Sequence, residues 1–232
     1  MRQPKLDFGF NGKWTRTQGV ELVELPNIPR PELKGKSVTI PGRDGDLWMP
    51  ENAYGMISFD LKCRTKKDAI LTDISSWLTG FGDLILPNFP DFHYRARLVE
   101  DFPYVPFLPR SGLYNFTVKC QCQPFRYRII AEEINLTAAA DILNPGTWRS
   151  LPIITVYGKG DGILSVGMQR VTLWGMSDYV TLDSETEEAF KGGESYNASM
   201  EGGFPALPTG KMRISWSGGI SRVAITPRWR WL

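Results

Sequence analysis

The chain has 232 residues, of which 42% are hydrophobic and 22% charged, with 27 Lys and Arg against 25 Asp and Glu. This length allows one large domain or two of ordinary size, and the apolar content excludes an intrinsically disordered protein. The net charge of +2 demands no polyanionic partner, and no run approaches the roughly 18 apolar residues of a membrane span. Residues 1–14 lack the apolar segment of a secretory signal, so we expect synthesis in a cytoplasm.

Proline and glycine are frequent and evenly scattered along the chain, with 17 and 23 residues respectively. This pattern predicts a mainly β fold of many short strands separated by turns. Polar and apolar residues alternate strictly over residues 56–64, which is typical of a half-buried strand. The strands expected in the first half are residues 20–25, 37–40, 56–64, 84–86, 93–98 and 113–124.

A projecting arm is expected after the first strand. Pro26, Pro29 and Pro31 follow that strand, and the sequence Pro-Gly-Arg-Asp-Gly at 41–45 is a strong turn signal. Because proline cannot sit in a central strand, a hairpin that stands out from the sheet fits this segment.

One segment has the period of a helix. Residues 65–68 (TKKD) resemble a capping box with Asp in place of Glu or Gln. The apolar residues that follow at helical spacing are Ile70, Leu71, Ile74, Trp77 and Leu78. We therefore expect one amphipathic helix of about four turns, which Gly80 ends.

The composition of the sequence changes near residue 130, where we place a boundary between domains 1–130 and 131–232. Residues 132–140 are polar and small, and Asn-Pro-Gly at 144–146 is a turn. The second domain is predicted to be an all-β sandwich. Its expected strands are residues 152–157, 163–166, 171–174, 179–183, 211–216 and 223–227, and residues 184–190 form either a short helical turn or a loop.

Groups for catalysis or metal binding are scarce. His93 is the only histidine, which excludes a site with several histidines and leaves one candidate general base. It lies in an aromatic strand-like run, so a structural role is favoured, while a pair with a cysteine stays open. Cys120 and Cys122 point to one face of a strand, a poor geometry for a disulfide, so we interpret them and Cys63 as free buried thiols.

Two further patterns have a simpler explanation than ligand binding. Gly158, Gly160 and Gly162 alternate with polar residues, but a strand rather than a helix is expected next, so a hairpin turn is favoured over a phosphate loop. An acidic cluster lacks the spacing of a calcium loop, so a solvated acidic edge is favoured. The acidic residues are Asp183, Glu185, Glu187 and Glu188. No nucleotide-binding, nucleophile-elbow or zinc-protease motif occurs, and we predict no catalytic, cofactor-binding or metal-binding residue.

Tryptophans of the second half are the remaining candidates for a ligand surface. They include Trp148, Trp174, Trp216, Trp229 and Trp231. Their rings could stack on sugars, but packing in a core or interface is favoured, because alternation places Trp174 and Trp216 inside strands. Trp229 and Trp231 alternate with arginines, which fits an edge strand docked on its own domain or a contact to a neighbour.

Several short segments, spread over nearly the whole chain, together form a recognisable series. They are residues 8–14 (FGFNGKW), 40–45 (IPGRDG), 76–78 (SWL), 84–86 (LIL), 94–96 (YRA), 120–127 (CQCQPFRY), 144–146 (NPG) with Pro152, 180–183 (VTLD), 203–210 (GFPALPTG) and 225–228 (ITPR). This series resembles the distal tail protein (Dit) family of siphophages and prophages of Gram-positive bacteria. The chain departs from the family at Gly210-Lys211-Met212, where a Gly-Glu-Asn-like step is usual.

The resemblance implies a fold and a role. The first domain would be a split-barrel-like β-domain with one helix and a projecting arm, and six copies would close into a ring at the end of the phage tail tube. The second would be a galectin-like β-sandwich. The ring would join the major tail tube protein to the tail-associated lysin, baseplate and receptor-binding proteins, while DNA passes through its lumen without specific binding. The protein would be a structural part of the virion, with no enzymatic activity, cofactor or membrane partner.

Two other functions are compatible with the residues. The aromatic-rich second half could be a carbohydrate-binding module that adheres to host cell-wall polysaccharide. A hydrolase could be built on His93 or on the acidic cluster, although nothing around these residues resembles a catalytic motif.

Overall fold

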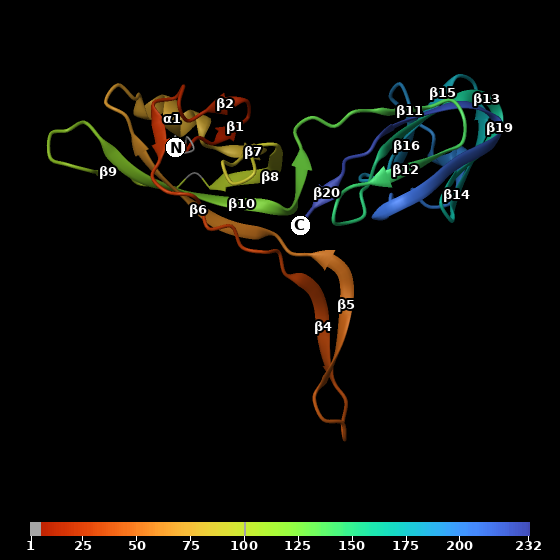
Figure 1. Ribbon diagram of the computed structural model, residues 1–232, viewed down its shortest axis with the longest axis horizontal. Coiled ribbons are helices and arrows are strands. Elements are labelled where there is room, and N and C mark those ends of the chain that lie inside the picture. Colours follow the sequence, from red (N-terminus) through yellow and green to blue (C-terminus); the bar gives the residue numbers. More distant parts are fainter. Residues whose placement is uncertain (1–5, 100) are drawn as a thin grey trace. The chain divides into compact units, whose positions relative to one another are not determined.

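The computed structural model describes residues 6–99 and 101–232, which fold into two compact units. One unit runs up to Arg126 and includes Leu232, and the other is Tyr127–Trp231. Within the described residues, α1 (Leu71–Trp77) is the single α-helix and η1 (Asn197–Ser199) the single 3-10 turn; all other elements are strands (Figure 1). The predicted mainly β fold is therefore confirmed. No helix of the described part is long and apolar enough to cross a membrane.

The first unit is built on one curled sheet with the strand order β2-β1-β7-β8-β10-β6-β3, to which β9 adds beside β10 (Figure 1). Its strands are β1 (Gly9–Phe10), β2 (Lys13–Trp14), β3 (Val20–Leu22), β6 (Ile57–Thr65), β7 (Gly80–Ile85), β8 (Phe92–Val99), β9 (Val105–Pro106) and β10 (Tyr114–Arg128). A separate two-stranded sheet consists of β4 (Leu33–Thr39) and β5 (Asp46–Tyr54).

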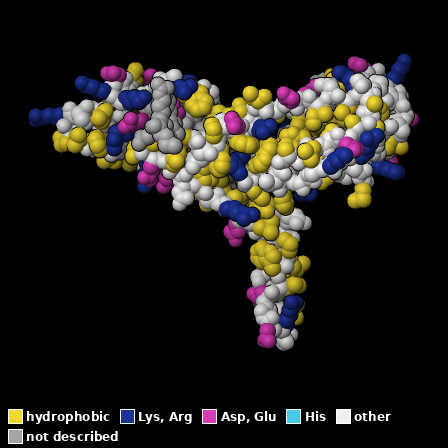
Figure 2. All heavy atoms as spheres, viewed as in Figure 1, with side chains coloured by type: hydrophobic (Ala, Val, Ile, Leu, Met, Phe, Trp, Pro, Cys, Tyr) yellow, Lys and Arg dark blue, Asp and Glu magenta, His cyan; other side chains and the backbone are white. Residues whose placement is uncertain are grey.

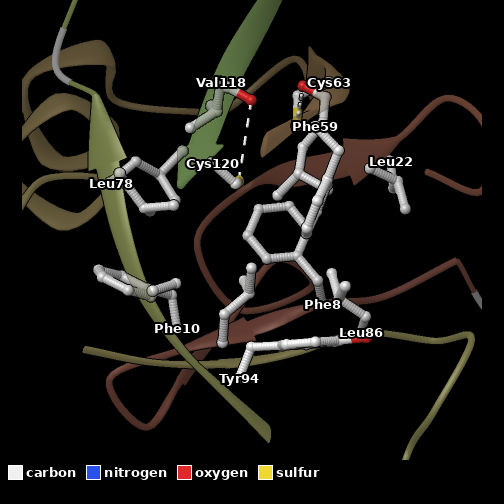
Figure 3. Close-up of a cluster of buried hydrophobic side chains, with 14 of the residues drawn as sticks. Phe8, Phe10, Leu22, Phe59, Cys63, Leu78, Leu86, Tyr94, Val118 and Cys120 are labelled. Atoms are coloured by element: carbon white, nitrogen blue, oxygen red, sulfur yellow. Dashed lines mark hydrogen bonds between the residues drawn. The ribbon is translucent and has the colours of Figure 1, made fainter. Parts of the chain in front are cut away.

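Strand β6 shows why one face of the sheet is buried. Its residues alternate between buried and exposed, as predicted, because successive side chains of a strand point to opposite faces. The register with β10 places Phe59 opposite Cys120 and Cys63 opposite Phe116, so both strands bury the same face. Figure 3 shows Phe59, Cys63 and Cys120 in one cluster with aromatic side chains from β1 and β8.

The helix is shorter than the four turns predicted. It has seven residues, and no side chain caps its first turn. Thr65, the expected cap, is instead the last residue of β6, and its hydroxyl accepts a hydrogen bond from the Tyr114 N–H at 2.9 Å. The apolar face is buried at its centre and end, as predicted, but its first residue, Ile70, is 60% exposed. Trp77 Nε1 donates to the Phe10 carbonyl at 2.9 Å, which fixes the helix on the sheet.

The second unit is a sandwich of antiparallel strands. They are β11 (Ile134–Leu136), β12 (Ala140–Asn144), β13 (Ile153–Val166), β14 (Gln169–Met176), β15 (Tyr179–Asp183), β16 (Glu188–Lys191), β17 (Glu194–Ser195), β18 (Met200–Glu201) and β19 (Gly210–Thr226). The short strand β20 (Arg230–Trp231) lies outside this sheet and pairs with β10. Residues 184–187 form a turn before β16 begins. The core is aliphatic and comes from both layers, for example Ile154, Leu173 and Ile214, each fully buried.

Strands β13 and β19 are longer than predicted. With 14 and 17 residues, each joins two strands that the sequence analysis placed separately. The first part of β13 pairs with β15 and its last part with β14, while β19 pairs first with β12 and then with β11. Each long strand therefore crosses from one layer of the sandwich to the other.

Glycines make this crossing possible. The ladder between β13 and β19 is irregular between Tyr157 and Gly162, where the two backbones approach closely. A Cβ added to Gly219 would lie 1.8 Å from the Lys159 carbonyl oxygen, and one added to Gly158 would lie 2.3 Å from the Gly219 oxygen. The glycine-rich segment is thus a bend inside a strand, and the predicted hairpin turn is wrong.

Candidate functional site

The β4–β5 hairpin forms an arm that stands out from the first unit (Figure 1). Six cross-strand pairs, from Leu33 opposite Tyr54 to Thr39 opposite Asp46, set its register. At the tip, the Asp46 carboxylate accepts hydrogen bonds from Ser37 Oγ and Thr39 Oγ1, both at 2.8 Å. These bonds, that from Thr39 first, lower the pKa of Asp46 and keep it ionised. The predicted projecting arm is confirmed, and a hydrogen-bonded carboxylate pins its turn.

One face of the arm carries apolar side chains that lie in solvent. Val38 pairs directly with Leu47, and Met49 follows on the same face; we call these three residues the apolar stripe. They are between 38% and 53% exposed. Figure 2 shows hydrophobic side chains along the arm. Side chains of this kind, gathered on a narrow projection, mark an interaction surface.

The other face of the arm holds Trp48 against Gly35. A Cβ at position 35 would lie 2.4 Å from the indole ring, so only glycine leaves room for the ring to lie flat over the strand. The ring is still 49% exposed. It borders a groove of about 390 Å³ whose lining includes Glu32 and Glu51. Both faces of the arm therefore carry exposed apolar side chains.

The arm is poorly supported by its own unit. At its base the Gly55 N–H donates to the Glu32 carbonyl at 2.9 Å, and the rings of Tyr54 and Phe125 meet edge to face at 5.9 Å. Beyond this base, β4 and β5 pair only with each other. Because an isolated two-stranded hairpin is marginally stable in water, a partner that covers the apolar stripe would stabilise it.

The cysteines form no reactive centre. All three are free and buried in the first core. Burial raises the pKa of the Cys122 thiol to about 12 and also raises those of the other two. A buried thiol with a raised pKa is a poor nucleophile. The three residues are Cys63, Cys120 and Cys122.

His93 lies near the start of β8, where its Nε2 is 3.6 Å from the Asp83 carboxylate. Desolvation lowers the pKa of His93, against the pull of Asp83. Its side chain is mostly buried, and the neighbouring Ile85, its pairing partner on β7, is apolar. Within residues 6–99 and 101–232, no three potential metal ligands gather at one place.

The acidic cluster is only in part the solvated edge that the sequence predicted, since two of its four residues are exposed and the other two are not. Asp183 is buried, and both its carboxylate oxygens receive hydrogen bonds from Arg228, at 2.6 and 2.9 Å. Burial opposes its ionisation, but the bonds from Arg228 and from the Glu185 N–H outweigh burial and lower the pKa of Asp183. Glu185 also pairs with Arg228 and with Arg230. Two of the four acidic residues thus hold the C-terminal segment on the second unit.

The tryptophans singled out in the sequence differ in their exposure. Trp216 and Trp229 pack against the second core. Trp174 is 41% exposed on β14, and the remaining two, Trp148 and Trp231, are half-buried. The exposed tryptophan of the arm, Trp48, was missed, although the run Leu-Trp-Met directly after a turn signal could have indicated it.

Comparison with known proteins gives a likeness in structure. No family model and no curated protein matches the sequence. Among solved structures, the Dit protein (gp 19.1) of SPP1 is similar, with a TM-score of 0.68 and 14% identity over 95% of this chain and 98% of the other. Its crystal structure is described as a paradigm of the hub adsorption apparatus in phages that infect Gram-positive bacteria. The chain therefore has the fold of this Dit protein over almost its whole length, which confirms, for the fold, the resemblance found in the sequence.

Proposed function

We propose that the chain is a structural hub of a siphophage tail tip, whose copies close into a hexameric ring at the distal end of the tail. The observation that carries this proposal is the match to the SPP1 hub protein over 95% of the chain, through both units and not through one common domain. Fold alone does not determine function, so the proposal also needs support from a particular surface. The arm provides that second line of support.

The arm fits the geometry of a ring. A cyclic assembly needs two different surfaces on each copy, one of which meets the other surface of the neighbour. A hairpin with an exposed apolar stripe and an exposed tryptophan is a surface that one copy can extend over the next. It adds contact area without enlarging the domain. In this proposal the first domain forms the ring and the second lies at its periphery.

The charge of the chain suits a channel wall. A lumen through which DNA slides must not hold it tightly, and a net charge of +2 offers little of the phosphate neutralisation on which DNA affinity depends. The ring would join the major tail tube protein to the tail-associated lysin and to baseplate or receptor-binding proteins. Its role would be architectural, without catalysis.

Labelling of virions tests this role. Gold-conjugated antibodies against the second unit should mark one end of the tail, opposite the capsid, in particles of the phage that encodes the chain. Label on the capsid, along the tube or on no particle would contradict the proposal. Antibodies against the major tail tube protein, which should mark the whole tube, control for accessibility.

A further inference from the structure

The second unit contains a small open pocket beside its outermost strand. The pocket has a volume of about 320 Å³ and lies where β16, β17 and η1 meet. Its polar and aromatic lining comes from Glu188, Phe190, Ser195 and Asn197. None of the tryptophans discussed above lines it.

Hydrogen bonds hold the walls of the pocket in place. Asn197 Oδ1 accepts from the Ala189 N–H at 2.7 Å, and the Tyr196 N–H donates to the Ala189 carbonyl at 2.6 Å. These bonds fasten η1 to strand β16. Asn197 uses its oxygen for this purpose, so its Nδ2 donor is left for a ligand. The pocket is therefore pre-formed, which lowers the cost of binding.

The ring of Phe190 shares a sheet face with two of the polar groups, Glu188 and Ser195. Phe190 pairs across the ladder with Ser195 on one side and with Thr181 on the other, and Glu188 lies two residues before it on the same face. The Phe190 side chain is half-buried. The pocket thus places one aromatic ring beside a carboxylate, a hydroxyl and an amide.

This set of groups selects a class of ligand. A carboxylate and a hydroxyl accept hydrogen bonds from hydroxyl groups, an amide donates one, and an aromatic face covers the C–H surface of a ring. No lysine or arginine lines the pocket, so no positively charged side chain would stabilise a bound anion there. A single carboxylate is too few ligands for calcium. The volume is at the lower end of the roughly 300–1,000 Å³ of ligand sites, enough for a small ligand only.

We infer that this pocket binds one neutral sugar residue of a glycan, with Phe190 under the sugar ring and Glu188 and Asn197 on its hydroxyls. The inference does not depend on the ring proposed above, since it concerns one edge of the second unit. It differs from the carbohydrate site that the sequence analysis considered, because it rests on none of the tryptophans.

Saturation-transfer NMR on the full chain tests the site, with glucose, galactose and N-acetylglucosamine as probes. At least one of them should bind, with a Kd on the order of 1 mM, as a single open subsite allows. Glu188→Gln removes a charged acceptor without a change of shape and should weaken binding about tenfold. Phe190→Leu keeps the apolar volume but loses the aromatic face, and should abolish the signal. Trp174→Ala is the matched control and should bind as the parent does.

Four results would overturn the inference. The first is no transfer to any of the three sugars. The second is unchanged binding in both Glu188→Gln and Phe190→Leu while circular dichroism shows them folded. The third is loss of binding in Trp174→Ala. The fourth is binding of a lysine side-chain analogue, N-acetyl-lysine methylamide, in place of every sugar, which would show that Glu188 binds a cation. None of these results bears on ring formation.

Discussion

Removal of the apolar stripe should dissolve the ring and leave the protein folded. In the double variant Leu47→Ala, Met49→Ala, the arm keeps its backbone ladder but loses two of its anchors. The side chains are 38% and 53% exposed, so roughly half of each remains to be covered by a neighbour. Since full burial of such a side chain stabilises by about 1.5–3 kcal/mol, the two together contribute about 2 kcal/mol per interface. That is a loss of about 30-fold in affinity at each interface.

Native mass spectrometry and analytical ultracentrifugation measure the effect. The parent should form a ring at micromolar concentration, and the double variant should shift towards monomers, because every interface of the ring is weakened. The thermal midpoint of the monomer should stay within a few degrees, as the stripe lies outside both cores. Met168→Ala, at a fully exposed methionine of the second unit, is the matched control and should leave the ring intact. A double variant that assembles as well as the parent would refute the reasoning.

Three further predictions concern the two cores. Gly219→Ala should destabilise the second unit by about 2 kcal/mol or more in denaturant unfolding, since its Cβ would clash with the Lys159 carbonyl, whereas Gly203→Ala, with open space around it, should be nearly neutral. Asp183→Asn should destabilise the same unit by about 2–3 kcal/mol at pH 7, because it leaves Arg228 partly unpaired in a largely buried site. The pKa of Asp183 is lower in the folded protein than its usual 3.8, so its contribution to the free energy of unfolding is complete above about pH 5 and is lost as the pH falls through the folded pKa. Denaturant unfolding curves of the parent at different pH values should show this loss, and those of Asp183→Asn should not. Iodoacetamide should alkylate the three buried thiols, Cys63, Cys120 and Cys122, only after unfolding. Rapid labelling of the native protein would contradict their burial.

Local patterns in the sequence were reliable where one residue period or one turn decides the structure. The alternation in β6 and the turn at residues 41–45 need no distant partner, and the structure has both the half-buried strand and the arm. Most of the apolar face of α1 was also predicted, but the start of the helix was not. Thr65 is as good a helix cap as it is a strand residue, and its partners far along the chain, Val20 and Tyr114, place it in the strand.

Features that depend on distant pairing could not be predicted. Gly158 looks like a turn residue in isolation, and its role becomes clear only when Gly219 lies against it. In the same way Asp183 looked like part of a solvated edge because its partner, Arg228, is 45 residues away. The sugar pocket is another case, since Glu188 and Asn197 are brought together by a hairpin of minimal length that carries no motif of its own.

For the arm, the sequence predicted the local turn but not the exposure of its side chains. Its turn was plain in the sequence, but the exposure of Trp48 and Met49 was not, because apolar residues in a strand pattern are normally assigned to a core. Only the structure shows that this hairpin has no core to face.

Electron cryo-microscopy of the purified chain tests the central claim most directly. We predict closed rings of six copies in which the arm of each copy lies on its neighbour, with Val38, Leu47 and Met49 covered. Particles that remain monomeric at high concentration, or rings in which the arms stay in solvent, would contradict the account.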